Sequence, residues 1–368
     1  MKKFLYVLLP FAIVSPAGAG EFVYDYSAVG GAFYGYSEFS KHIKHYKHHN
    51  TPSYLEVFSS AGYEFDADTS LMINADAQIA GAKEVEDYNH GDWGENVYAT
   101  LQSHYGDVSV GQVYNAAYQM AVGAPSVGYF KANNSPITDF LANPNWQRNS
   151  KVTSYRTLNS TYLNTDADAM KISYITPEFY GTKAAFSYTP DSYSKAGLLN
   201  KDSAYEHKSS YAAGLYNLSD FGYFEAESSL GYAYNRKNNQ EISAGLSLYR
   251  KGWTLGGSYR KSFTSGSDYA LAGTSENGLP AYYDGFRKGD AYNVGLSYEI
   301  GPFKTGVTYF ASAADKTADK NKTVTFANRF AFNKYAEVYA AAAWSEYKSE
   351  IEGKNNGTAV ICGLEFNI

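Results

Sequence analysis

Apolar and polar residues alternate one by one over most of this chain, in segments of roughly ten residues. In the final segment every second residue from Val360 to Ile368 is apolar, with Gly363, Glu365 and Asn367 between them. Such alternation predicts a β-strand with one apolar and one polar face. Sixteen segments show it, and we place the strands near 26–37, 53–65, 70–80, 95–105, 107–114, 168–176, 182–190, 208–217, 223–235, 241–250, 253–262, 290–300, 303–313, 322–332, 334–347 and 358–368.

The connections between these strands alternate between short and long. The short ones carry tight-turn residues, as in Lys251-Gly252 and Gly301-Pro302. An even number of antiparallel strands closes into a barrel without an unpaired edge, which a bilayer requires. We therefore expect an all-β, 16-stranded antiparallel transmembrane β-barrel; a secreted β-sandwich or β-helix would share the alternation but not the regular order of turns. The long connections fall at 38–52, 81–94, 115–167, 191–207, 236–240, 263–289, 314–321 and 348–357.

Composition agrees with a barrel in a membrane. Aromatic residues make up 17% of the chain, yet the mean hydropathy is −0.41. Lipid-facing and lumen-facing residues average out in this way in transmembrane barrels. A basic start, an apolar stretch and Ala17-Gly18-Ala19 predict a signal peptide over residues 1–19, with the barrel over 20–368. Beyond residue 19 no apolar run approaches the roughly 18 residues of a membrane helix.

Several function classes are disfavoured. The formal net charge is −6, without a basic stripe, which argues against nucleic-acid binding. The single cysteine, Cys362, excludes an internal disulfide framework. Outside the first long connection the histidines are His90, His104 and His207, and none lies in a nucleophile motif. We therefore expect no enzyme activity and no cofactor.

Three stretches resemble the general (non-specific) porins of Gram-negative bacteria, particularly the alphaproteobacterial type. They are residues 105–112 (YGDVSVGQ), residues 171–190 (KISYITPEFYGTKAAFSYTP), and the last strand, which ends in Ile368 where a terminal Phe is usual. The resemblance implies a homotrimer in the outer membrane. It also implies a water-filled channel for passive diffusion of ions and small hydrophilic solutes, narrowed by a third loop folded into the lumen.

The longest connection, 115–167, contains apolar residues such as Phe140 and Trp146 that would be costly on an exposed tip. We expect it to pack inside the barrel as a constriction loop. Asp139 is its acidic pore-lining candidate, with Asn133 and Asn134 as neutral companions; alternatively, Asp139 caps a short helix.

The resemblance also implies wall arginines opposite that loop, one directly after a strand glycine. Here Gln112 follows Gly111. The alternation points Asn74, Asp76 and His104 inward on nearby strands, and the basic inward candidates lie farther round the wall. A lumen with few basic side chains near its carboxylates has a negative electrostatic potential, so we predict weak cation preference. The basic inward candidates are Lys171, Arg260 and Arg329.

Other hypotheses remain open. His42, His45, His48 and His49 could bind zinc or copper, or could belong to a basic loop that contacts lipopolysaccharide. A sugar-selective channel would need an aromatic track, and a plugged barrel could be an adhesin. The inward tyrosines are expected to be scattered, and small outward residues could mark a subunit contact with other copies in the membrane. These tyrosines are Tyr98, Tyr216, Tyr249, Tyr335 and Tyr339, and the small residues are Gly257, Ala336, Ala340 and Ala342.

Overall fold

A computed structural model describes residues 20–40, 48–51, 53–80, 96–127, 157–158, 160–163, 166, 169–190, 209–235, 239–263, 288–315, 320–349 and 353–368. These residues form one antiparallel sheet and a short helix, α1 (Ala116–Gln119). The strands are β1 (Glu21–Phe39), β2 (His49–Asn50), β3 (Ser53–Glu64), β4 (Ser70–Ala80), β5 (Asn96–Gln102), β6 (Asp107–Gln112), β7 (Met170–Ile175), β8 (Thr182–Thr189), β9 (Ser210–Asp220), β10 (Glu225–Asn235), β11 (Asn239–Arg250), β12 (Trp253–Ser262), β13 (Gly289–Ile300), β14 (Phe303–Ala314), β15 (Lys320–Asn333), β16 (Ala336–Ser349) and β17 (Gly353–Asn367).

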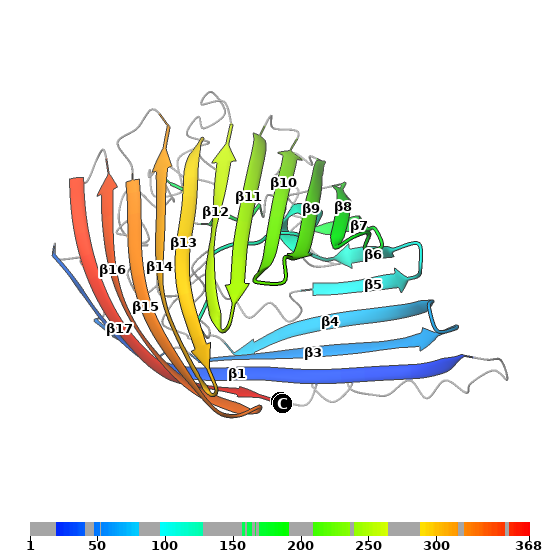
Figure 1. Cartoon of the computed structure of the whole chain (residues 1–368), viewed down its shortest axis with the longest axis horizontal. Coiled ribbons are helices and arrows are strands. Elements are labelled where there is room, and N and C mark those ends of the chain that lie inside the picture. The colour runs from blue at the N-terminus through cyan, green and yellow to red at the C-terminus, as the bar shows by residue number, and fades with distance from the viewer. Residues whose placement is uncertain are drawn as a thin grey trace, which may run out of the picture.

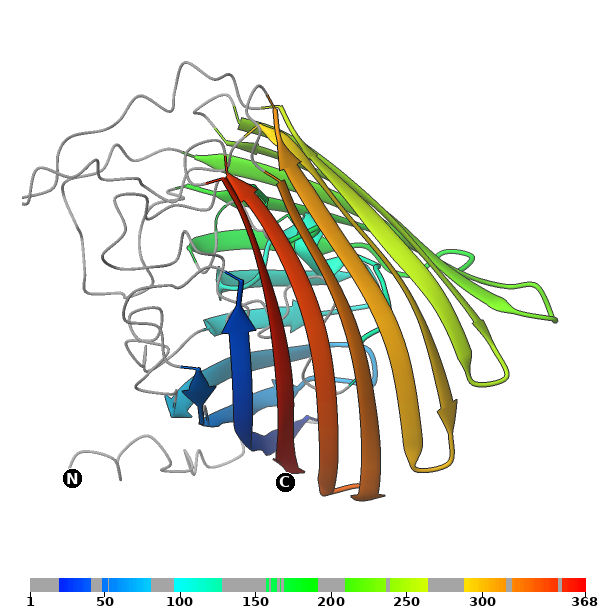
Figure 2. The ribbon, with the colours of Figure 1, turned by 90° about the vertical axis from the view of Figure 1, so that its left-hand side faces the viewer.

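The sheet closes into a 16-stranded barrel, as predicted. Each strand pairs with its neighbours in the chain, and β1 lies between β17 and β3 (Figure 1). The two-residue β2 pairs with β1 beyond the end of β3, so it continues that strand after a break. Ala28 and Ile368 exchange two backbone hydrogen bonds of 2.9 Å, which seal the first strand to the last. Figure 2 shows the C-terminus at the end where β15 turns into β16.

The strand alternation separates an outer from an inner face. On β13 the outward set Tyr292, Val294 and Leu296 is exposed, while Asn293 and Gly295 between them and Ser297 after them are buried. The same parity makes Cys362 an exposed outward residue on the last strand, as expected. The outer surface is therefore the apolar band that a bilayer covers. The four residues of α1 are too few to cross a membrane, so no helix among the described residues could do so.

Part of the inner face is apolar rather than wet. Phe33, Tyr339 and Ile361 are buried inside the barrel, and Val127 from the long connection packs against them. The rings of Phe33 and Tyr339 lie 5.2 Å apart. This cluster gives the connection an apolar anchor on β1, β16 and β17, which the alternation of the last strand did not indicate.

Candidate pore constriction

Strand β6 ends with a backbone conformation that only glycine adopts easily. Gly111 has φ +140°, and a Cβ there would lie 2.4 Å from the carbonyl oxygen of Val97. Gln112 and Asn115, which follow, are buried. Asn115 caps α1 by accepting from the Tyr118 N–H at 2.9 Å. The chain is thereby directed from the wall into the barrel.

Residues 116–127 then run along the inner wall over glycines of six successive strands, which we call the glycine track. A Cβ at Gly214 would lie 2.7 Å from the Ala116 carbonyl oxygen, and one at Gly245 would lie 1.9 Å from that of Val122. Missing side chains thus let the loop backbone contact the wall directly. The track consists of Gly214, Gly231, Gly245, Gly256, Gly295 and Gly306 on β9 to β14.

Wall side chains bind the loop backbone along this track. Ser229 accepts from the Val122 N–H at 2.9 Å, and the Ser247 hydroxyl donates to the Gly123 carbonyl at 2.8 Å. Asn293 accepts from the Ala124 N–H at 3.2 Å. Ser247 and Asn293 therefore face inward as the alternation predicts, but they hold the loop instead of lining open water.

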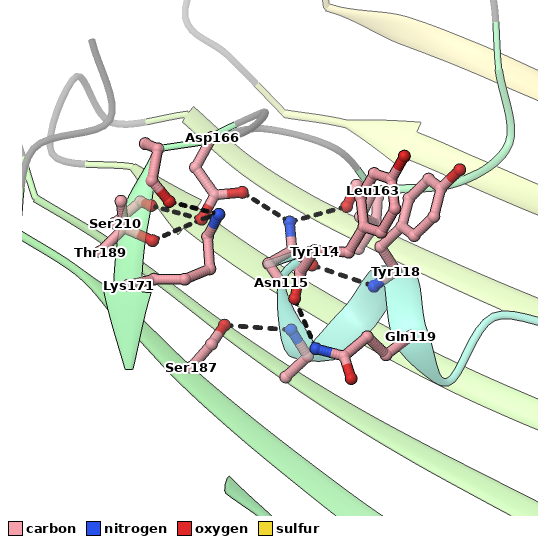
Figure 3. A network of polar contacts seen from close by, with 12 residues as sticks. Tyr114, Asn115, Tyr118, Gln119, Leu163, Asp166, Lys171, Ser187, Thr189 and Ser210 are labelled. Atoms are coloured by element: carbon pink, nitrogen blue, oxygen red, sulfur yellow. Dashed lines mark hydrogen bonds and ion pairs between the residues drawn. The ribbon is translucent and has the colours of Figure 1, made fainter. Parts of the chain in front are cut away.

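A buried polar network joins the two ends of the connection (Figure 3). The Asn115 side-chain amide donates to Asp166 Oδ1 at 2.8 Å and to the Leu163 carbonyl at 2.9 Å. Thr189 donates to the other carboxylate oxygen. Lys171 Nζ lies 3.9 Å from Asp166, and both side chains are almost fully buried. Because buried charges require partners, this network fixes residues 115 and 166 together.

The returning part of the connection is held by a second buried ion pair. Arg260 lies 2.6 Å from Glu241, with 1% and 0% of these side chains exposed. Arg260 also donates to the backbone carbonyls of Ser160 and Tyr162, at 3.3 and 2.8 Å. Nearby, Thr161 accepts from the Asn293 side-chain amide at 2.9 Å. Both described ends of the 115–167 connection are thus attached to the wall formed by β8 to β14.

The wall of β3 to β5 carries the neutral and acidic side chains predicted from the alternation. Asn74 and Asp76 have inward parity on β4 and are half-buried. Asn96 donates to Asp76 Oδ2 at 2.8 Å, whereas Asp76 Oδ1 is buried without a hydrogen-bond partner among the described residues. Basic side chains do not occur on the described parts of these three strands.

The other predicted site residues fall in several places. Lys171 and Arg260 have the expected inward parity, but the loop covers them. Arg329 is inward and partly exposed, 3.0 Å from Glu299 and 3.7 Å from Glu337. His104, expected on the wall, instead lies exposed in the short turn between β5 and β6, because β5 ends at Gln102. Asn133, Asn134, Asp139, His42 and His45 lie outside the described residues.

The described histidines of the first long connection pack against tyrosines. His49 Nδ1 lies 2.5 Å from the Tyr34 hydroxyl, and His48 Nδ1 lies 2.8 Å from the Ser37 carbonyl. Among the described residues no group of three or more potential ligands could hold a metal ion.

Two contacts on the inner wall, near the short-turn end, do not follow from the alternation of residues. Tyr216 and Tyr249 both donate to the carboxylate of Glu227, at 3.1 and 2.6 Å. Tyr216 and Tyr249 lie on β9 and β11, with β10 between them, so they share one carboxylate without being on neighbouring strands. The strand register could have indicated these contacts. Tyr249 lies opposite Glu225 and Tyr216 lies opposite Ser229, and each of these positions on β10 is two residues from Glu227.

Fold and site together define a transmembrane β-barrel channel whose lumen holds part of a long loop. A family model for Gram-negative porins matches residues 50–350. The chain therefore belongs to the Gram-negative porin family, and it is a channel protein of the outer membrane. A search of curated protein sequences finds no match.

Solved porin structures share the fold over almost the whole chain. OmpF of Salmonella typhi, in complex with daunomycin, has 12% sequence identity and a TM-score of 0.61, over 94% of this chain and 97% of that one. An anion-selective porin from Comamonas acidovorans has 14% identity and a TM-score of 0.57, over 95% and 100%. OmpT of Vibrio cholerae in its trimer form has 12% identity and a TM-score of 0.56, over 94% and 99%. At these identities the likeness concerns the fold alone.

Proposed function

We propose that this porin is a weakly cation-preferring channel for small hydrophilic solutes, narrowed by a constriction loop over residues 115–167. Residues 1–19 are proposed to be a signal peptide. Pore-lining roles are assigned to Asp76 and Asn74 on the wall, to Arg329, and to Asp139 with Asn133 and Asn134 on the loop; Gln112 is buried in the wall and is not among them. The attachment of both described ends of the connection to the inner wall supports the loop assignment.

The pairing of inward charges carries the proposed selectivity. Among the described residues, each inward-facing basic side chain lies within 4 Å of a carboxylate, so its field is largely cancelled. Asp76 and Glu227 instead accept hydrogen bonds from neutral groups, and their charges are left to act on passing ions. The basic pairs are Lys171–Asp166, Lys183–Glu178, Arg260–Glu241, Lys304–Glu299 and Arg329–Glu299.

Removing one uncompensated charge tests this. In a planar bilayer with a KCl gradient, the wild-type reversal potential is expected to have the sign for K⁺ preference. Asp76→Asn should move it toward zero, because one negative charge leaves the lumen wall. Asp68→Asn, which removes a charge from the exposed turn after β3, should leave it unchanged. Anion preference of the wild-type channel would contradict the proposal.

A homotrimer is the proposed assembly. Small outward residues cluster on β1, β3, β4 and β5, and such residues let transmembrane surfaces approach closely. Ala340 and Ala342 on β16 extend the same surface across β17, which lies next to β1. The small outward residues of the first strands are Ala28, Gly30, Ala32, Ser59, Ala61, Ala75, Ala77 and Ala99.

Contact with lipopolysaccharide is proposed at a row of lysines on the outer face. Lys320 of β15 lies directly opposite Lys348 of β16, which lies directly opposite Lys354 of β17. All three are exposed at the long-loop end, above the outward-facing Trp344. Glu346 lies 2.6 Å from Lys354 and balances one of the three charges. Like charges directly opposite one another, as in Lys320 and Lys348, are destabilising unless an anion lies between them. Phosphate groups of a membrane lipid would supply that charge at this depth.

The lysine row predicts a loss of lipid binding. Lys348→Gln should weaken retention of phosphate-bearing lipid by the detergent-purified protein, as measured by native mass spectrometry. Lys334→Gln serves as a matched control, because Lys334 lies at the opposite end of the same β15–β16 hairpin. Equal retention by both variants would contradict the assignment.

A further inference from the structure

Tyrosines surround one carboxylate on the inner wall near the short-turn end of the barrel. Glu227 of β10 faces Leu218 on β9 and Ser247 on β11. Tyr216 and Tyr249, two residues away on these strands, are therefore its diagonal neighbours. Tyr216 donates to Oε1 at 3.1 Å and Tyr249 to Oε2 at 2.6 Å. Both carboxylate oxygens accept hydrogen bonds from neutral hydroxyl groups. These donors fix the position of the carboxylate but do not neutralise its negative charge.

The loop brings three more tyrosines to this part of the wall. The rings of Tyr114 and Tyr118 stack, with their centroids 4.4 Å apart and an angle of 18° between their planes. The ring of Tyr118 also packs edge-to-face against that of Tyr162, with a centroid distance of 5.4 Å. Burial, with Tyr118 and the negative charge of Glu227 nearby, raises the pKa of Tyr162 to about 12. These side chains and Glu227 are only half-buried, so solute in the lumen has access to them.

The charge of Glu227 determines which solute suits this arrangement. Among the described residues no lysine or arginine forms an ion pair with it; Lys183 of β8, directly opposite Tyr216 of β9, pairs with Glu178 instead. A carboxylate between low-dielectric walls attracts cations. The faces of tyrosine rings also attract cations, and clusters of aromatic rings recognise quaternary ammonium groups. A neutral sugar would use the rings but not the charge.

We propose that Glu227 and its surrounding tyrosines form a weak binding site for alkylammonium solutes in the channel. The site consists of Glu227, Tyr114, Tyr118, Tyr162, Tyr216 and Tyr249. Wall strands β9 to β11 and both described ends of the connection contribute to it. It extends the proposed cation preference, because such a solute must first enter the lumen, and it adds a preference for organic over inorganic cations.

Choline and its uncharged isostere 3,3-dimethylbutan-1-ol test the site in a planar bilayer. Choline is expected to raise the open-channel noise of the K⁺ current with a saturable concentration dependence, and the alcohol is not. In Glu227→Gln the apparent dissociation constant of choline should rise about tenfold, the scale of a lost interaction with a charged group. Tyr118→Leu should weaken choline binding without changing the reversal potential, because the substitution is neutral.

A matched control separates the site from general lumen charge. Glu299→Gln removes an equal charge near the same end of the barrel, on β13, far from the tyrosines in the strand order. It should leave choline binding close to that of the wild type. Equal weakening by Glu227→Gln and Glu299→Gln would overturn the site, as would equal binding of the alcohol. Anion preference in the KCl gradient with choline binding intact would contradict only the proposed selectivity and would support the site.

Discussion

Arg260→Met is expected to destabilise the folded barrel by about 3–5 kcal/mol, because it removes the guanidinium that lies against the buried carboxylate of Glu241. Glu241 is fully buried, and Arg260 is its ion-pair partner at 2.6 Å. The carbonyls of Ser160 and Tyr162 lose a donor in the same step. Urea unfolding in detergent, followed by tryptophan fluorescence, would measure the change.

The same variant should also alter conduction. With its return run released from β12, the loop is free to move into the lumen, and brief interruptions of the single-channel current should become more frequent. Adding Glu241→Leu to Arg260→Met should recover much of the lost stability, since the buried negative charge is then removed together with its cation. Arg250→Met, on the outward face at the short-turn end, is the control. Wild-type stability in Arg260→Met would mean that the pair does not hold the loop.

The strand order and the two faces of the barrel follow from residue alternation. A period of two determines which side chains share a face, so the inward position of Asp76 and the outward position of Cys362 were predictable. The residues at which strands begin and end were less predictable, because pairing beyond the alternating segment depends on the length of the neighbouring strand. β1 extends back to Glu21 by pairing with β3, whereas β5 stops before His104.

What the loop covers could not be read from alternation. Period-two patterning marks Lys171, Ser247 and Arg260 as inward, but it does not separate a side chain in water from one under a loop. That distinction depends on contacts between residues about 100 positions apart, such as Arg260 with Tyr162. The glycines of the track were likewise visible only as small inward residues. Their spacing along six strands has meaning only once the strands are side by side.

Gly245→Ala tests whether the glycine track holds the loop against the wall. The added Cβ would lie 1.9 Å from the Val122 carbonyl oxygen, where ordinary contact begins at 3.4 Å. The loop backbone must therefore move toward the lumen axis, and the hydrogen bonds of Ser229 and Ser247 to it would lengthen. We expect a destabilisation of about 1–3 kcal/mol, the usual cost of overpacking.

The sign of the conductance change distinguishes this variant from a general loss of structure. A loop displaced from the wall occupies more of the lumen, so Gly245→Ala should lower the single-channel conductance while the current steps remain stable. Ala244→Val enlarges the adjacent residue on the lipid-facing side and should leave conductance unchanged. Higher conductance in Gly245→Ala would mean that the loop had left the lumen altogether. The contact at Gly245 would then be required for its placement, because the remaining glycines of the track would not have retained it.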